Sequence, residues 1–252
     1  MDTHPATTPG PADTAGARWA LVTGGSIRGG LAISRALHAR GLGVVVHHSG
    51  PASADRAQSV VDGLNAQRPG SARRWQAALH EHVAFDDPTL PLSVVVCNAS
   101  RLAASHVGDL DDALHDFRVH VSGHAALLAS VEPQLRRNLG SVVAVGDLQT
   151  QQPNRDHVWY LVAKAGLETL MRTLAVEWAP DVRCNAVAPG ALDWHEGWRD
   201  EPRRVAIMAS IPQQRIGTFE ERAGCVAWQA LDASYVSGQV LKMDGGRSAA
   251  LP

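Results

Sequence analysis

A tyrosine and a lysine four residues apart, Tyr160 and Lys164, are the pair on which a chemical interpretation of this chain depends. In a helix this spacing puts both side chains on one face, one turn apart. A nearby ammonium favours the phenolate, so we expect it to lower the pKa of Tyr160 from about 10 toward neutral pH. Tyr160 would then be able to donate a proton to a substrate. Many helices carry such a pair by chance, so the interpretation needs support from the rest of the sequence.

A glycine-rich segment near the N-terminus predicts a phosphate-binding turn. The apolar run 19–22 predicts a strand, residues 23–30 (TGGSIRGG) a turn, and residues 31–40 a helix. In this context glycines let backbone N–H groups approach a diphosphate at the helix N-terminus. We therefore expect a dinucleotide here, in preference to a purely structural turn. The turn residues expected to contact it are Gly24, Ser26, Arg28 and Gly30.

The end of the second predicted strand, residues 43–48, bears on the choice of dinucleotide. NAD sites usually carry an acidic residue here that binds the ribose 2′-hydroxyl. This chain has His47, His48 and Ser49 instead. With Arg28 nearby and no carboxylate, the site is expected to accept a 2′-phosphate, which predicts NADPH over NADH. The alternative is an exposed strand end without a ligand.

Apolar runs alternate with helical patterns along the chain, which predicts a doubly wound parallel sheet. We expect an α/β, Rossmann-like fold with helices on both faces of the sheet, forming a single domain over residues 18–252. The expected strands are 19–22, 43–48, 74–79, 93–97, 141–145, 182–187 and 239–243, and the expected helices are 31–40, 56–67, 109–137, 158–178 and 220–231. Residues 80–92 hold at most a stub of the usual crossover helix. Residues 191–211 are expected to be irregular.

Composition favours a small-molecule partner. The formal net charge is -2, with 23 Lys and Arg scattered among 25 Asp and Glu, which indicates neither nucleic-acid nor membrane binding. No apolar run reaches the ~18 residues of a membrane span, and three cysteines without paired spacing indicate a reducing compartment, so a soluble, cytoplasmic protein is expected. Residues 1–17 are expected to be a disordered arm. The scattered histidines and carboxylates predict no metal site.

Several motifs together resemble the short-chain dehydrogenase/reductase superfamily over residues 19–248. They are TGGSIRGG, CNAS at 97–100, Tyr160-x-x-x-Lys164, NAVAPG at 185–190 and SGQVLKMDGG at 237–246. Within the superfamily the chain is most similar to the pteridine reductase branch, which includes dihydromonapterin reductases. The arginine in the glycine turn, the two histidines after the second strand, NAS in place of NAG, and an aspartate at position 147 carry that similarity.

The resemblance implies roles for individual residues. Tyr160 is the implied proton donor, Lys164 holds the cofactor ribose and tunes Tyr160, and Asp147 is the third active-site member. His120 aligns with an asparagine that anchors a proton-relay water, and a histidine there preserves a relay because it can both donate and accept; the alternative is a satisfied core histidine. Ser100 is expected to touch cofactor or substrate. The further implied cofactor contacts are Asn98, Ala99, Pro189 and Gly190.

Asp147 indicates the kind of substrate. Most of the superfamily has a serine here, whose hydroxyl donates to a carbonyl oxygen, whereas an ionised carboxylate only accepts. Asp147 therefore suits a substrate that presents N–H groups, such as a reduced pterin or another cyclic imine. The alternative is that Asp147 caps a local turn.

The position of Leu102 departs from the pteridine reductases, which usually place an aromatic residue there to stack on the pterin. Its absence forgoes roughly 1 kcal/mol of ring contact. Leu102 remains an expected substrate contact, and Trp194, Trp198 or Trp159 would have to supply the ring if the substrate is a pterin.

The leading hypothesis is an NADPH-dependent reductase acting on a pteridine or a related C=N heterocycle. A carbonyl reductase of secondary metabolism is the first alternative, and an NADP-binding sensor with little catalysis is the second. The long helices at 109–137 and 158–178 resemble those through which the superfamily forms tetramers, so a homotetramer is expected and a dimer is the alternative.

Overall fold

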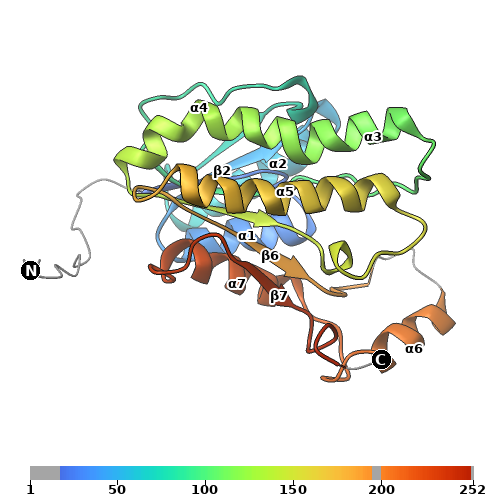
Figure 1. The fold of residues 1–252 in the computed structure, drawn as a ribbon. Helices are drawn as coiled ribbons and strands as arrows, with labels where there is room; N and C mark the ends of the chain where they lie inside the picture. The colour runs from blue at the N-terminus through green and yellow to red at the C-terminus, as the bar shows by residue number, and fades with distance from the viewer. Residues whose placement is uncertain (1–17, 195–199, 251–252) are drawn as a thin grey trace, which may run out of the picture.

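A parallel sheet of seven strands forms the centre of the protein, whose computed structural model describes residues 18–194 and 200–250. The spatial order of the strands is β3-β2-β1-β4-β5-β6-β7, as expected for a doubly wound fold (Figure 1). The strands are β1 (Trp19–Val22), β2 (Gly43–His48), β3 (Ala72–Gln76), β4 (Leu92–Cys97), β5 (Ser141–Val145), β6 (Arg183–Pro189) and β7 (Val240–Met243). The predicted fold class is confirmed.

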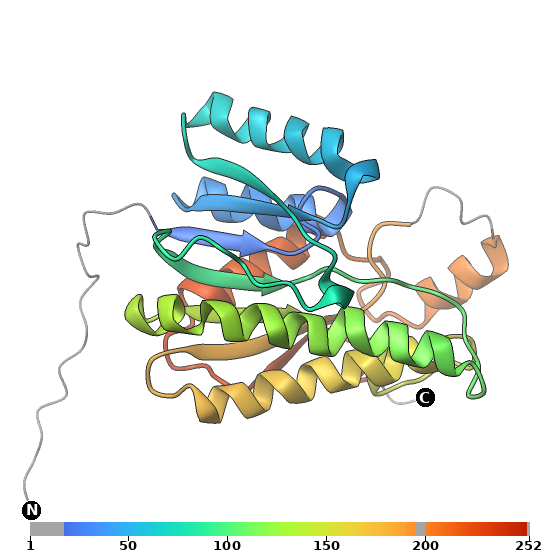
Figure 2. The same ribbon diagram turned by 90° about the horizontal axis from the view of Figure 1, so that it is seen from above.

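Helices cover both faces of this sheet (Figure 2). One layer contains α1 (Arg28–Ala39), α2 (Ala54–Gln67) and α7 (Phe219–Leu231), and the other contains α3 (Leu110–Phe117), α4 (Gly123–Arg137) and α5 (Val158–Glu177). A π-helical segment, Arg118–Ser122, joins α3 to α4. Helix α6 (Glu201–Ala209) lies apart from both layers (Figure 1). No helix among the described residues is long and apolar enough to cross a membrane.

The central strands are apolar along their whole length because both of their faces are buried. In β4, Val95 points into the core beneath α4 and α5, while its neighbours Val94 and Val96 point into the core beneath α1 and α7. This alternation follows from the two-residue period of a strand. Strand β1 pairs with β2 on one side and β4 on the other, so the strand order reverses at β1. Ligands of doubly wound folds bind at the carboxyl ends of the strands at this reversal.

Three segments differ from the sequence-based expectation. Strand β3 covers Ala72–Gln76 rather than 74–79, and its exposed arginines identify it as a sheet edge rather than a buried strand. Helix α1 begins at Arg28 rather than at residue 31. The stretch 191–211, expected to be irregular, contains α6. Between β3 and β4 only a 3-10 turn forms, Leu79–Glu81, as the short spacing predicted. The predicted disordered arm, residues 1–17, lies outside the described residues.

Candidate active site

Tyr160 and Asp147 are in direct contact at the carboxyl edge of the sheet. Asp147 follows β5, and its Oδ2 accepts a hydrogen bond of 2.7 Å from the hydroxyl of Tyr160 on α5. Burial, together with the neighbouring Asp147 carboxylate, raises the pKa of Tyr160 well above 10. The expectation that Lys164 lowers this pKa is therefore wrong for the protein as described. Asp147 also caps a local turn, since its Oδ1 accepts from the Gln149 N–H at 2.8 Å, so the turn-capping alternative and the Tyr160 contact both hold.

Lys164 lies one turn along α5 from Tyr160, as the spacing predicted. Its side chain is buried, and Nζ donates to the carbonyl oxygen of Val145 at 2.8 Å. The ammonium lies 5.7 Å from the centre of the Tyr160 ring. Burial lowers the pKa of Lys164 to about 8, although the Asp147 carboxylate opposes that shift. Lys164 is thus a cation that loses its charge near the physiological range.

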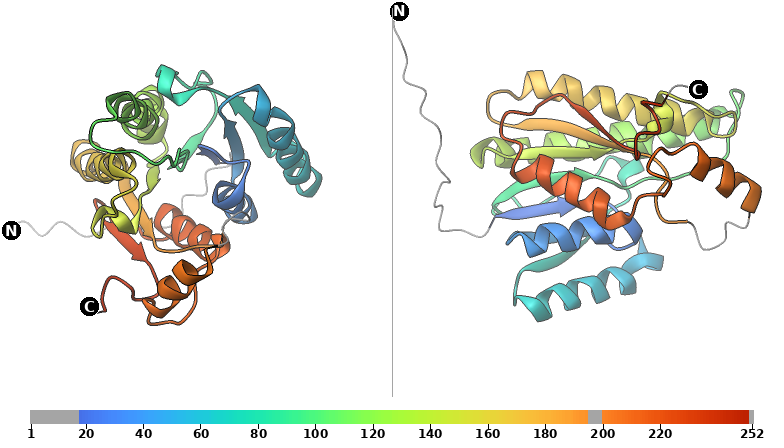
Figure 3. Two further views of the ribbon diagram at one scale, coloured as in Figure 1. Left: turned by 90° about the vertical axis from the view of Figure 1, so that its right-hand side faces the viewer. Right: turned by 90° about the horizontal axis from the view of Figure 1, so that it is seen from below.

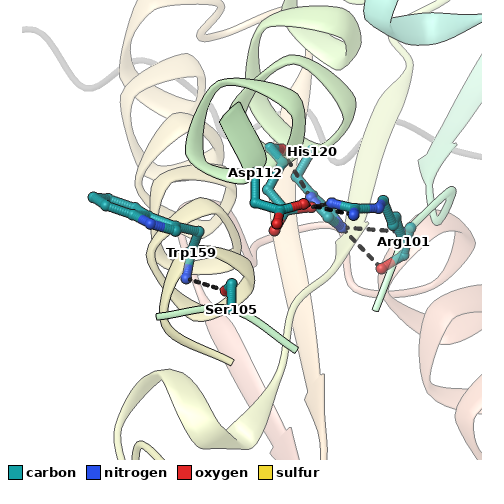
Figure 4. Close-up of polar contacts among 7 residues, drawn as sticks. Arg101, Ser105, Asp112, His120 and Trp159 are labelled. Atoms are coloured by element: carbon teal, nitrogen blue, oxygen red, sulfur yellow. Dashed lines mark hydrogen bonds and ion pairs between the residues drawn. The ribbon is translucent and has the colours of Figure 1, made fainter. Parts of the chain in front are cut away.

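His120 supports Ser100 from the π-helical segment. Nδ1 of His120 donates to the carbonyl oxygen of Asp116, so Nε2 is the acceptor that faces Ser100 Oγ at 2.9 Å and the Arg101 N–H at 3.3 Å (Figure 4). Burial lowers the pKa of His120 to about 3. A proton relay that charges the ring is disfavoured by this low pKa, and the geometry instead makes His120 a neutral acceptor that orients the Ser100 hydroxyl beside Tyr160.

Arg101 fixes the loop after β4 to helix α3. Its guanidinium bonds to Asp112 at 2.6 Å and to the buried Asp116 at 3.1 Å. On the other side of the same region, the backbone N–H of Trp159 donates to Ser105 Oγ at 3.2 Å, and the indole points away from Arg101 and His120 (Figure 4). Trp159 is therefore not placed to stack on a ligand beside His120.

The glycine turn requires glycine at two positions. A Cβ at Gly30 would lie 2.0 Å from the carbonyl oxygen of Gly24, and Gly24 has a φ of 62° that favours glycine. Asn98 Nδ2 donates to the Thr23 carbonyl oxygen at 2.9 Å, which ties the end of β4 to the turn. The first backbone N–H groups of α1 are thereby presented to a diphosphate, and a dinucleotide fits this turn.

Two further buried histidines, His47 and His124, contact residues at the start of the glycine turn. The Gly24 N–H donates to His47 Nδ1 at 2.9 Å, while His47 Nε2 donates to the Ala77 carbonyl oxygen at 2.8 Å. Nε2 of His124 lies 3.0 Å from Thr23 Oγ1. Burial lowers the pKa of both rings to about 4, so both are neutral. The expected charge-assisted contact from His47 to a 2′-phosphate is not available, because both of its ring nitrogens are already bonded.

A cavity of about 380 Å³ lies between the glycine turn and the end of β2. Its lining includes the predicted contacts Gly24, Ser26, His47, His48, Ser49, Ala99 and Ser100, and also Arg56. His48 Nε2 is buried without a partner among the described residues. Arg28 does not line this cavity, whereas two other arginines, Arg56 on α2 and Arg101, do. The sequence analysis missed Arg56 because it counted only residues adjacent to the two motifs.

A second cavity of about 540 Å³ opens in front of Asp147 and Tyr160. Its lining also includes Arg28, Leu102, Gln149, Asn154, His157, Leu192, Asp193, Trp194 and Arg203. Leu102 is 66% exposed, and its aliphatic side chain has no aromatic face on which a ligand ring could stack. Among the described residues, the aromatic side chains that line this cavity are His157, Tyr160 and Trp194. Trp198 lies outside them. Predicted contacts Pro189 and Gly190 end β6 at the same sheet edge, where the Gly190 N–H donates to Met243 O at 2.9 Å.

Fold and glycine turn together define a dinucleotide-dependent oxidoreductase. A family model described as Enoyl-(Acyl carrier protein) reductase matches residues 26–248. The chain belongs to the short-chain dehydrogenase/reductase superfamily.

Three known proteins illustrate the range of its relatives. An oxidoreductase of Bacillus subtilis, YmfI, is 31% identical over 237 residues, which cover 90% of this chain and 97% of the relative. Glucose 1-dehydrogenase 2 of the same organism is 30% identical over 90% of this chain and 93% of its own. The crystal structure of FolM alternative dihydrofolate reductase 1 from Brucella canis, complexed with NADP, superposes with a TM-score of 0.82 at 28% identity, covering 93% of this chain and 95% of that one.

Proposed function

We propose that this protein is an NADPH-dependent reductase of a C=N bond in a pteridine or a related heterocycle. The observation that carries the proposal is the hydrogen bond from the Tyr160 hydroxyl to Asp147, at the wall of the 540 Å³ cavity. A carboxylate here replaces the hydroxyl donor that a ketone oxygen requires. The similarity to a solved structure titled as a dihydrofolate reductase supports the same substrate class.

The arrangement divides the reaction between two side chains. Bound NADPH would supply a hydride to the carbon of the C=N bond, and the nitrogen would take a proton from the Tyr160 hydroxyl. Asp147 would accept hydrogen bonds from the N–H groups of the heterocycle and orient its ring. The raised pKa of Tyr160 keeps the phenol protonated until the substrate nitrogen, on becoming basic, takes the proton.

The preference for NADPH rests on the cavity beside β2. Ser49 and Arg56 line it, so a hydroxyl and a guanidinium are available as donors. A 2′-phosphate would accept hydrogen bonds from both, and no carboxylate among the described lining residues would repel it. The solved relative that is titled as a complex with NADP supports this preference.

A substrate panel tests the proposal. NADPH oxidation is measured with a dihydropterin and with a set of ketones, and NADH is compared in parallel. We expect turnover of the dihydropterin, little turnover of ketones, and a preference for NADPH of at least about tenfold, equivalent to one charge-assisted contact. Turnover of ketones alone would establish the carbonyl reductase alternative instead.

Tyr160→Phe provides the matched variant, because it removes only the phenolic hydroxyl. We expect kcat to fall by about 100-fold or more, while the Kd for NADPH stays within about threefold of the wild type. An unchanged kcat would remove Tyr160 from the mechanism. Tight NADPH binding without turnover of any panel member in the wild type would support the sensor alternative.

A further inference from the structure

Arg222, on the first turns of α7, extends across to the glycine turn. A Cβ placed on Gly29 would lie 1.3 Å from a terminal guanidinium nitrogen of Arg222, so this side chain fills the space above Gly29. The same nitrogen lies 3.4 Å from Asn98 Oδ1, a long contact. Nε of Arg222 is buried and has no hydrogen-bond partner among the described residues. An arginine with a buried and unsatisfied donor is uncommon in a folded protein.

Among the charged groups around Arg222, the cation Arg28 has the largest effect on its pKa, and the carboxylate Asp193 acts more weakly in the opposite direction. The guanidinium carbons of Arg28 and Arg222 lie 5.4 and 5.5 Å from the centre of the same ring, that of Phe219. The nearest acidic group on the neighbouring loop, Asp193, accepts a hydrogen bond of 2.7 Å from the Phe219 N–H. No ion pair joins Arg222 to a carboxylate in the described parts of the chain. Burial first, and then repulsion by Arg28, lowers the pKa of Arg222 to about 10, so it is still a cation at neutral pH.

A partly buried cation without a salt-bridge partner carries a desolvation cost, which a ligand that supplies negative charge would offset. The N-terminus of α1, a helix of 12 residues, points its backbone N–H groups at the same place. Two arginines and a helix terminus therefore meet at the glycine turn, whose Gly24 and Ser26 line the 380 Å³ cavity and whose Arg28 lines the 540 Å³ cavity. The ligand segment that crosses from one cavity to the other is the one that would meet this positive charge.

We propose that Arg222 binds the diphosphate bridge of the dinucleotide, with its guanidinium donating to phosphate oxygens that lie beside the glycine turn. The inference rests on the proposed use of a dinucleotide and adds to it a contact from α7, some two hundred residues beyond the glycine turn in sequence. A diphosphate is favoured over the 2′-phosphate because His48, Ser49 and Arg56 lie in the other cavity. Arg222 thus supplies the charge that the uncharged glycines of the turn lack.

Binding of ligand fragments to Arg222→Gln tests the proposal. We expect the Kd for NADPH and for ADP, which both contain a diphosphate, to rise by about tenfold to 100-fold, the usual range for one charge-assisted contact. The Kd for 2′-AMP, which has no diphosphate, is expected to stay within about twofold of the wild type. Arg222→Lys retains the charge and should restore part of the lost affinity. Isothermal titration calorimetry on the full chain measures all three ligands.

Arg35→Gln is the matched control, because Arg35 is an exposed arginine on α1 itself; its Kd values should equal those of the wild type. Wild-type affinity of Arg222→Gln for ADP would overturn the proposal. An equal loss of affinity for 2′-AMP and ADP would also overturn it, since Arg222 would then act through the fold and not through the diphosphate. A wild type that binds NADPH but reduces no pterin would contradict the proposed function alone.

Discussion

The hydroxyl of Tyr160 stays protonated because the side chain is buried and the Asp147 carboxylate is its neighbour, and Lys164 does not convert it to a phenolate. Burial of the Tyr160 side chain disfavours the phenolate. Asp147 accepts a hydrogen bond of 2.7 Å from this hydroxyl, which disfavours the phenolate further. Lys164 instead donates a hydrogen bond to the backbone of β5, and its own pKa is lowered to about 8. Of the pair Tyr160 and Lys164, it is therefore Lys164 whose pKa lies close to neutral pH.

We expect kcat/KM to decline above about pH 8, because the buried Lys164, whose pKa is about 8, then loses the charge with which we propose that it holds the cofactor ribose. Tyr160 adds no decline below about pH 10, since its pKa is raised. NADPH oxidation with a dihydropterin from pH 6 to 10 measures the profile. Lys164→Arg keeps a charge throughout this range and should lose the alkaline decline, at whatever lower rate it retains. Coincident profiles for the two proteins would contradict this assignment.

For individual residues, the sequence predicted which side chains lie in the candidate site better than it predicted the contacts that they make. The four-residue spacing of Tyr160 and Lys164 is a local property of a helix, so their shared face could be predicted. The approach of Arg222 to Asn98 joins positions 124 residues apart, and no local pattern encodes it. The same reason applies to His47, whose type suggested a ligand contact, while its ring is bonded on both sides by backbone groups brought there by folding.

Among the elements, the carboxyl ends of β1, β2 and β4 depend on three buried histidines. His47 holds the Gly24 N–H, His124 contacts Thr23, and His120 orients Ser100. Burial lowers the pKa of each ring, to about 4 for the first two and about 3 for the last. All three must be neutral in the folded protein.

The free energy of unfolding is expected to fall as the pH drops below about 6.5. The unfolded chain then protonates these histidines, while the folded chain does not until about pH 4, so acid favours unfolding. Each ring would account for roughly 2 kcal/mol of lost stability between pH 7 and pH 5. Urea unfolding at the two pH values measures the difference.

His124→Gln should reduce that difference by roughly 2 kcal/mol, because it removes one of the buried rings that resist protonation. His106→Gln is the control, since His106 is exposed, and it should behave as the wild type does. Equal stability of the wild type at pH 7 and pH 5 would show that the buried rings do not resist protonation.

The elements themselves were largely predictable, and the exceptions have physical causes. Buried parallel strands and amphipathic helices leave strong periodic patterns, so six of the strands and both long helical regions were expected near their observed bounds. Strand β3 was misplaced because an edge strand whose residues are mostly exposed has a weaker apolar signal. Helix α6 has no buried residue, so it lacks the apolar stripe by which a helix is recognised.

For the whole molecule, the outer surface of α3 and α5 is unusually apolar. Leu110, Leu114 and Phe117 share one face of α3 and are at least half exposed, as is Val162 on the adjacent α5. These two helices lie side by side on one outer layer (Figure 3). Apolar side chains of this size on adjacent helices are typical of an interface. We propose that a second copy of the chain covers this surface and that the assembly is a homotetramer.

Leu114→Asp combined with Phe117→Asp should reduce the mass of the assembly, because two carboxylates would have to be buried at the contact. Size-exclusion chromatography with light scattering measures that mass. Leu139→Asp is the control, since Leu139 is 71% exposed in the turn between α4 and β5, and its assembly should be unchanged. A wild type that elutes as a monomer at micromolar concentration would contradict the proposal.

The missing crossover helix between β3 and β4 makes the two sides of the sheet unequal. Where a helix would lie, a loop crosses instead, with the Phe85 ring 5.2 Å from that of Trp75 and its N–H bonded to Ser130 at 3.1 Å. A loop can gain or lose residues without disturbing strand register. The rim of the 380 Å³ cavity, to which Leu79 and His80 of this segment contribute, is therefore the part of this architecture where insertions and deletions can accumulate during evolution while the surroundings of Tyr160 keep their geometry.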